Sequence, residues 1–442
     1  MAIRVGRLFR RSGILIPLLV GLQAPTEIRA QEVIVPLQLS LSDPGARSMG
    51  FGGAFVGLAD DATAAFANPA GLVQLLRPEV SIEGRSWSHS MPFTAGGRVE
   101  GLPSGVGIDT TVGLRTATSG YEAEGLSYVS LAYPRGTWSF ALYRHQYADL
   151  GFSGETQGLY GGGSDCCQNR WFDQRMTSSL NIVNYGLSAA YRLSDKLSIG
   201  LGLAYFDASL IATGTEFRWD EDTIGSFFAP SSFLPARSVK TERLFVDDTD
   251  WTIAGGFLWR LSEDWTIGGV YRQGFEADIG TETTAGPANN LGAAPGEILF
   301  RATGIPFEFP DIYGVGFAYR HPDGRLTVSF QWDRVEYSDL PDSLRLDDQT
   351  IDDADELHLG AEYVFLGSTP IIALRLGAWL DPDHQMRATI DEPFIRAMLP
   401  AGDDETHYSA GLGVAMRRFQ IDLALDFADR VDTVSLSAIY NF

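Results

Sequence analysis

Two arginines lie at positions where a guanidinium could bind a carboxylate inside the protein. Arg272 and Arg375 occur in strand-like stretches, on the face opposite the apolar rows. A guanidinium can hold a ligand carboxylate through two parallel hydrogen bonds. The arginines could instead pair with acidic residues on the same face, such as Glu362, Asp422 and Asp426. Pairing with these acids is the simpler explanation, because a protein interior that encloses a channel is polar in any case.

The histidines do not form a catalytic or metal-binding motif. The sequence contains His89, His145, His321, His358, His384 and His407. None has a local nucleophile signature beside it, and His358 and Glu362 share a strand face without the helical spacing of metal ligands. We therefore expect no catalytic residue, no metal and no cofactor. The alternative that would need these residues is an enzyme, namely a membrane hydrolase that uses serine and histidine at its outer rim.

The two cysteines are adjacent, as Cys166 and Cys167, and closely follow three consecutive glycines. In an exported chain they could form a vicinal disulfide, pair with another molecule or stay free. A zinc site is not expected, because no second cluster of cysteines or histidines completes a tetrahedral ligand set. We interpret the pair as a structural feature of a loop.

The stretch from residue 45 to residue 72, GARSMGFGGAFVGLADDATAAFANPAGL, is predicted to be a compact plug enclosed by the rest of the chain. Its glycines and alanines allow backbone to pack closely against backbone. Asp60 and Asp61 are expected to cap a helix that begins near Ala62, and Pro69 is expected to end it. A glycine-rich turn at the start of an N-terminal domain is the alternative.

Residues 1–30 have the pattern of a secretory signal peptide. Arginines precede an apolar run at 14–22, and Ala30 offers a cleavage site. Cleavage there removes five of the 33 basic residues and one of the 56 acidic residues, which leaves 28 and 55 and a net charge of −27. Such a charge argues against nucleic acid and against anionic lipid surfaces as partners.

A two-residue apolar period recurs through residues 79–442, and no domain linker interrupts it. Between residues 185 and 193 every second residue is apolar, and those between are mostly polar or small. The same alternation occurs in 197–205, 251–259, 313–319, 326–332, 357–365, 408–416, 419–427 and 434–442. Tyrosine and tryptophan close many of these rows, as in the aromatic girdles of membrane barrels.

Connection lengths separate a membrane barrel from a soluble β-protein. Short turns lie near 134–136, 194–196, 262–264, 321–324, 367–369 and 417–418, and long connections near 91–123, 149–175, 216–238, 281–300, 339–354 and 382–404. Short turns at one rim and long loops at the other are typical of outer-membrane barrels. We predict an all-β transmembrane antiparallel barrel of about 14 strands at 79–442, with residues 31–78 as a hatch in its lumen. A soluble all-β protein is the alternative.

The N-terminal stretch resembles the hatch of the FadL-type outer membrane transporters of hydrocarbons and long-chain fatty acids. The resemblance lies in its ADDA (59–62) and NPAG (68–71) elements, and segments 185–205, 309–333 and 407–442 are similar to that family's barrel strands. It implies passive uptake of hydrophobic small molecules, which leave sideways into the outer membrane past the hatch. The hatch residues we expect to matter are Gly52, Gly53, Asp60, Asp61, Asn68, Pro69 and Ala70.

Two of the long connections carry apolar side chains that could capture a ligand. In the FadL-type family, a groove between the third and fourth outer loops is the first capture site. The candidate residues here are Phe227, Phe228, Phe233, Leu234 and Phe307. The alternative is that they pack the loops over the barrel mouth, since only exposed apolar patches mark binding sites.

The resemblance also implies a monomer that is surrounded by outer-membrane lipid and lipopolysaccharide and inserted by the barrel-assembly machinery. A partner-binding barrel that acts as a scaffold in protein secretion is the alternative, because secretion-associated relatives have a start similar to GARSMGFGGAF. The sequence does not distinguish fatty acids from hydrocarbons as substrates.

Overall fold

The structure is a computed structural model, and its described residues all belong to one compact unit, Val33–Phe442. The described residues are 41, 43–161, 169–171, 173–219, 228–231, 233–340, 349–391 and 393–442. The predicted signal peptide, Cys166, Cys167 and Phe227 lie outside them. Among these residues, no helix combines the length and the hydropathy that a membrane span requires.

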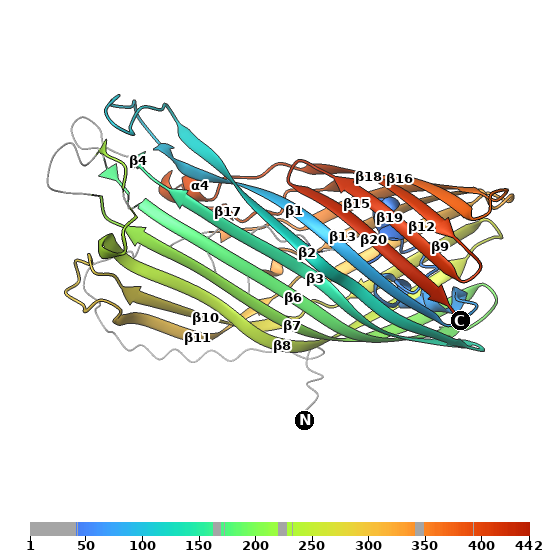
Figure 1. The fold of residues 1–442 in the computed structure, drawn as a ribbon. Coiled ribbons are helices and arrows are strands. Elements are labelled where there is room, and N and C mark those ends of the chain that lie inside the picture. The colour runs from blue at the N-terminus through green and yellow to red at the C-terminus, as the bar shows by residue number, and fades with distance from the viewer. Residues whose placement is uncertain are drawn as a thin grey trace. The chain divides into compact units, whose positions relative to one another are not determined.

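The strands form a closed antiparallel barrel (Figure 1). In the described part of the chain the barrel wall consists of fourteen crossings, and we call each crossing, whether one strand or two consecutive strands, a stave. The staves are β1 (Glu79–Arg98), β2 (Leu114–Arg135), β3 (Trp138–Thr156), β6 (Asp173–Arg192), β7 (Leu197–Phe217), β8 (Ser238–Arg260), β9 with β10 (Trp265–Arg272 and Glu276–Ala285), β11 with β12 (Ile298–Glu308 and Ile312–Arg320), β13 (Leu326–Val335), β15 (Ala354–Phe365), β16 (Ile371–Asp381), β18 (Glu405–Ala415), β19 (Phe419–Phe427) and β20 (Val431–Asn441). β20 pairs with β1, from Glu79 opposite Asn441 to His89 opposite Val431, and so closes the barrel. The predicted fold class is confirmed.

Shorter elements lie outside the staves. The connections contain β4 (Leu159–Gly161), β5 (Asn169–Arg170), η3 (Pro235–Arg237), β14 (Gln349–Thr350), β17 (Arg387–Ala388) and α4 (Pro393–Met398). The N-terminal segment, which we define as residues 43–78, contains α1 (Ala46–Gly50), α2 (Ala64–Ala67) and η1 (Pro69–Gln74).

The apolar rows face outward and the polar or small rows face inward, as predicted. In β6, Tyr185 and Leu187 are about half exposed, whereas Asn184 and Ser188 are buried. Aromatic rings pair near the short turns, at Trp138–Tyr191, Trp265–Tyr319 and Phe419–Tyr440. This arrangement gives a lipid-facing band with an aromatic girdle at its edge.

Short turns and long connections lie at opposite rims, but the strands are longer than the sequence pattern predicts. The sequence predicts a long connection at 91–123, whereas residues 91–98 and 114–123 continue β1 and β2. The strands also extend into four of the other five predicted connections. The exception is the connection at 382–404. Backbone pairing continues beyond the lipid-facing band, where side chains no longer need to alternate in polarity. One connection at the long-loop rim, 428–430, is short.

The N-terminal segment lies in the lumen and contacts opposite parts of the barrel wall. α1 contacts β16, β18, β19 and β20, and η1 contacts β2, β3, β6, β7 and β8. Phe51, Phe55 and Leu58 are at most 1% exposed. The expectation that the barrel encloses this stretch therefore agrees with its burial and contacts.

The helix of this segment, α2, begins at Ala64, two residues after the predicted start near Ala62. Its N-cap residue, Thr63, makes no side-chain cap hydrogen bond. Asp61, one of the two acids predicted to cap it, accepts hydrogen bonds from the Thr63 backbone N–H (2.9 Å) and Oγ1 (2.5 Å), in the turn just before the helix. Asp60 turns toward arginines, which bind a carboxylate more strongly than backbone amides do.

Close backbone approach decides where the segment is seated. A Cβ atom added at Gly200 of β7 would lie 2.3 Å from the backbone nitrogen of Ala70 and 2.4 Å from the carbonyl carbon of Pro69. Only glycine therefore allows η1 to lie this close to the wall.

We expect Gly200→Ala to loosen η1 without unfolding the barrel. Overpacking of this kind costs about 1–3 kcal/mol, so amide hydrogen exchange at residues 64–75 should rise roughly tenfold or more. The control is Gly255→Ala on the adjacent strand, where a Cβ would meet only Leu201 at 3.7 Å. Unchanged exchange in Gly200→Ala would contradict the close packing described here.

Candidate functional site

A cavity of about 120 Å³ lies in the lumen against the N-terminal segment. The segment contributes Ser48, Met49, Gly52 and Gly53 to its lining, and the barrel contributes aromatic side chains such as Trp87, Tyr147 and Trp379 together with charged groups. The charged and imidazole groups are Asp43, Arg85, Arg272, Asp333, Glu356, His358, Asp381, His407 and Asp426. Aromatic surface with a few convergent polar groups is the usual composition of a small-molecule site.

Arg272 lines this cavity and a second one of about 30 Å³, whose lining includes Phe66 and Phe206. Its guanidinium carbon lies 5.0 Å from the centroid of the Phe66 ring, and Nη2 lies 3.6 Å from Asp43 Oδ1. Its Nε has no hydrogen-bond partner among the described residues. Of the two predicted lumen arginines, Arg272 is therefore the one that faces the cavities.

Arg375 is committed to acidic residues instead. Its Nε donates to Glu362 Oε2 and its Nη1 donates to Asp422 Oδ1, both at 2.7 Å, and the side chain is buried. These are two of the acids that the sequence offers as alternative partners. The third, Asp426, lies 2.7 Å from His407 Nδ1.

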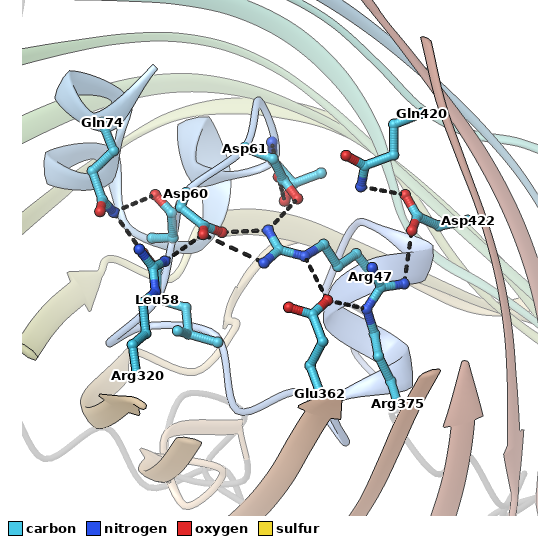
Figure 2. Close-up of polar contacts among 12 residues, drawn as sticks. Arg47, Leu58, Asp60, Asp61, Gln74, Arg320, Glu362, Arg375, Gln420 and Asp422 are labelled. Carbon is cyan, nitrogen blue, oxygen red and sulfur yellow. Dashed lines mark hydrogen bonds and ion pairs between the residues drawn. The ribbon is translucent and has the colours of Figure 1, made fainter. Parts of the chain in front are cut away.

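The acidic pair of the N-terminal segment joins this network through Arg47 (Figure 2). Arg47 pairs with Asp60 and lies 3.7 Å from Asp61 Oδ2 and 3.5 Å from Glu362 Oε2. Arg320, at the end of β12, pairs with the other oxygen of Asp60. Ion pairs thus connect the segment to the wall at β12 and β15.

The two neighbouring carboxyl groups respond oppositely to burial. Burial alone would raise the pKa of Asp60, but Arg47 and Arg320 outweigh it and lower the pKa below its usual value. Burial raises the pKa of Asp61, and Arg47 and the Thr63 hydrogen bonds offset only part of this effect. Burial likewise would lower the pKa of Arg47, yet Asp60, Glu362 and Asp61 raise it well above its usual value. The network therefore favours a charged Asp60 over a charged Asp61.

The NPAG element is fixed against β7 and β8. Asn68 Nδ2 donates to the carbonyl oxygens of Val56 (3.0 Å) and Phe257 (3.1 Å), and its Oδ1 accepts from Ala70 N at 3.2 Å. Ser198 Oγ donates to the carbonyl oxygen of Ala70 at 3.0 Å. Pro69, between these anchors, begins η1.

Gly52 and Gly53 pack against the facing wall, at β15 and β16. Both have a positive φ, 63° and 78°, which glycine adopts without strain. A Cβ would lie 2.8 Å from Ala378 N at Gly52 and 2.9 Å from His358 Nδ1 at Gly53. The predicted glycines are therefore explained by backbone conformation and close contact.

The predicted capture residues fall into two groups. In the third long connection, Phe228 stacks on Tyr160 with ring centroids 6.1 Å apart, Phe233 packs edge-to-face on Phe217, and Leu234 is 53% exposed. Phe307 belongs to β11 and packs edge-to-face on Phe309. Phe228, Phe233 and Phe307 thus pack within the loops and the wall, Leu234 presents an exposed apolar surface, and Phe227 lies outside the described residues.

The backbone ladder between β2 and β3 is interrupted. These strands pair only between Tyr128 opposite His145 and Arg135 opposite Trp138. Beyond this point residues 114–127 pair with β1, and β3 pairs with β6 past a bulge at Gln146/Ala148. The halves of β2 and β3 nearer the long-loop rim therefore have no backbone ladder between them in the described part of the chain.

Sequence reasoning missed several residues that line the larger cavity. Trp379 stacks between two histidines, with ring centroids 5.2 Å from His358 and 3.8 Å from His407. Asp333 and Glu356 also face the cavity. Each occupies an inward position of its strand, but only the register between strands shows that they meet.

This geometry defines a membrane barrel whose lumen holds the N-terminal segment and a cavity lined by aromatic and charged side chains. Residues 151–429 match the family described as "Outer membrane protein transport protein (OMPP1/FadL/TodX)". The chain belongs to this family of outer membrane transport proteins, and its place is the outer membrane. No curated protein matches the sequence significantly.

Solved structures show the same fold at low sequence identity. A Pseudomonas aeruginosa FadL homologue is 16% identical with a TM-score of 0.63, over 92% of this chain and 100% of that chain. The P. putida toluene transporter TodX is 14% identical with a TM-score of 0.55, over 91% and 99% of the two chains. The Ralstonia pickettii toluene transporter TbuX is 19% identical with a TM-score of 0.52, over 90% and 98%.

We expect Asp60→Asn to destabilise the seated N-terminal segment more than Asp61→Asn does. Losing the charge-assisted hydrogen bonds of Asp60 should cost about 2 kcal/mol, or roughly 30-fold faster hydrogen exchange at residues 45–75. Asp61→Asn removes a charge that burial disfavours and retains an oxygen for Thr63, so exchange should change little. Equal effects of the two substitutions would contradict the opposite pKa shifts.

The pH dependence of the stability of the seated N-terminal segment should also arise from the charge of Asp60. Because the pKa of Asp60 is lower in the folded protein, its contribution is complete above the unfolded carboxyl value of about 3.9 and is lost as pH falls through the folded value. Hydrogen exchange corrected for its intrinsic pH dependence should show this loss below about pH 4 in the parent chain. The loss should be absent in Asp60→Asn.

Proposed function

We propose that this protein takes up hydrophobic small molecules passively and releases them sideways into the outer leaflet between β2 and β3. The observation that carries the proposal is the separation of these strands beyond Tyr128. An apolar solute gains little from an aqueous pore, but the polar lipopolysaccharide layer blocks its direct entry. A sheltered path through the wall would therefore suffice.

Side chains replace backbone pairing where the two strands part. Ser119 Oγ accepts from the backbone N–H of Ser153, and Tyr121 Oη donates to Asp149 Oδ1, both at 2.9 Å. Such contacts are individually worth about 1 kcal/mol, less than a continuous ladder provides. A passing ligand can displace them at low cost.

The N-terminal segment would act as the hatch, and the third and fourth long connections would form the capture surface. The hatch role is supported by its place in the lumen beside the larger cavity. The capture role is supported by the exposure of Leu234 and, in the fourth connection, of Leu291 at 59%. We propose a monomer without catalytic activity, with fatty acids or aromatic hydrocarbons as the substrate classes.

Tying β2 to β3 should block lateral release. In a chain whose own cysteines are replaced by serine, Tyr121→Cys with Gly151→Cys should cross-link on oxidation, because a Cβ at Gly151 would lie 3.0 Å from Tyr121 Cγ and therefore close to the Tyr121 Cβ. Uptake of labelled oleate and toluene into whole cells should fall on oxidation and return with reductant. The control pair, Leu187→Cys with Leu203→Cys, links strands that are already paired and should leave uptake unchanged. Equal uptake before and after reduction of the 121–151 link would contradict lateral release there.

Substitution of Arg272 should distinguish the substrate classes. If a carboxylate binds Arg272 in the cavity, Arg272→Met should lower oleate uptake by roughly tenfold or more, since hydrogen bonds to charged groups contribute about 1.5–3 kcal/mol. Toluene uptake should be unaffected, because toluene has no charged group. Arg301→Met, at a 57% exposed side chain that pairs with Glu282, serves as the control. An equal loss for both compounds would contradict a head-group role.

A further inference from the structure

A group of metal-ligand side chains lies on the lumen wall apart from the Arg47 network. Asp333 of β13 and Glu356 and His358 of β15 bring one ligand atom each within 4.8 Å of one another. Asp333 and His358 are 4% and 7% exposed, and all three line the larger cavity. The cavity gives a cation and a bound water access to the group.

The strand register holds these three residues in place. Asp333 lies directly opposite Glu356 in the β13–β15 ladder, and His358 follows Glu356 by two residues on the same face. Side chains at such positions lie about 5 Å apart at their Cβ atoms. The site is therefore built on two paired strands and needs no loop to close it.

The hydrogen bond at His358 Nδ1 orients the ring. Nδ1 lies 2.7 Å from the carbonyl oxygen of Gly52, which can only accept, so Nδ1 carries a hydrogen. Nε2 then points at Glu356 Oε2 (3.4 Å) and Asp333 Oδ2 (3.6 Å) and has no hydrogen-bond partner among the described residues. A neutral Nε2 lone pair facing two carboxylates is repelled, and either a cation between them or a proton on Nε2 would remove this repulsion.

The distances from His358 Nε2 to the two carboxylate oxygens suit ligands of one metal ion better than direct hydrogen bonds. Hydrogen bonds of this kind are usually about 2.7–3.2 Å long. Ligand atoms bound tetrahedrally to Zn²⁺ at about 2.0–2.1 Å are roughly 3.4 Å apart. The two Nε2–oxygen distances are close to this value, so a small inward shift of the carboxylates would complete the set.

The surroundings also resemble the outer shell of a metal site. A metal-bound histidine commonly donates its second N–H to a carbonyl oxygen, as His358 does to Gly52. Gln331 Nε2 donates to Asp333 Oδ2 at 2.6 Å and thereby orients that carboxylate. Among the described residues, no lysine or arginine nitrogen lies within 4.0 Å of the carboxylates of Asp333 or Glu356.

We propose that Asp333, Glu356 and His358 bind a divalent transition-metal cation of the Zn²⁺ type, with water as the remaining ligand. The site is joined to the N-terminal segment on two sides. His358 contacts Gly52, and Gln331 Oε1 accepts from the backbone N–H groups of Phe55 (2.8 Å) and Val56 (2.7 Å). Cation binding therefore stabilises the seated segment, whatever compound the barrel transports.

Zinc titration of the purified full chain in detergent, after removal of metals with a chelator, tests the site. We expect one Zn²⁺ per chain by calorimetry and slower hydrogen exchange at residues 52–56. Glu356→Gln and His358→Gln should each weaken binding at least about tenfold. Visible absorption of bound Co²⁺ should be lost in the same variants, and heat-modifiable gel mobility would show that they are folded.

Two histidine variants serve as matched controls. His407→Gln lies in the neighbouring group with Asp381 and Glu405, where Nε2 is 3.9 Å from its nearest carboxylate, and His321→Gln removes an exposed histidine. Both should keep the parent affinity. Absence of Zn²⁺ binding would show that His358 is simply protonated between the carboxylates, and binding that survives in Glu356→Gln and His358→Gln would place the metal elsewhere. Either result would overturn the proposal.

Discussion

The closed backbone ladder is the constraint on which the rest of this structure depends. Hydrocarbon offers no partner to an exposed N–H or C=O group, so a strand-built wall must close on itself. The pairing of β20 with β1 provides this closure. A barrel with fourteen staves in the described part of the chain encloses a lumen too wide for its own side chains to fill. The N-terminal segment occupies part of this space.

The way the segment is held follows from where it lies. Lumen-facing side chains donate to its carbonyl groups, as Ser188 does to Ala65 at 2.6 Å and Tyr128 does to Ala62 at 3.1 Å. Each such hydrogen bond contributes only about 1 kcal/mol net. Buried ion pairs such as Arg47–Asp60 add orientation, but desolvation offsets much of their Coulomb energy. Many contacts that each contribute little free energy therefore hold the segment in one place, so a local rearrangement that breaks one or two of them costs little.

The sequence predicted the features that depend on one strand at a time. Alternation showed which face is lipid-exposed, and the parity of connection lengths showed the barrel. Features that depend on register between strands were out of reach, because a shift by one residue reverses which side chains face each other. The meeting of Asp333 with Glu356 is one case. The pairing of Arg47 with Glu362 was out of reach for a different reason, because it depends on where α1 lies against the wall. Of the two acids predicted to cap the helix near Ala62, Asp60 pairs with Arg47 and Arg320 instead, and the local sequence does not show this pairing.

Interrupted strands do not all have the same consequence. Between β9 and β10, and again between β11 and β12, the staves break, yet Phe309 N donates to the carbonyl oxygen of Phe275 at 2.9 Å across the break. Asp311 accepts from Gly274 N and Tyr271 Oη, both at 2.7 Å, so this part of the wall is resealed. β2 and β3 part beyond Tyr128 without a backbone ladder between their described residues. A lateral path requires a stretch of wall without a backbone ladder, and the β2–β3 boundary has such a stretch where the β9–β12 region does not.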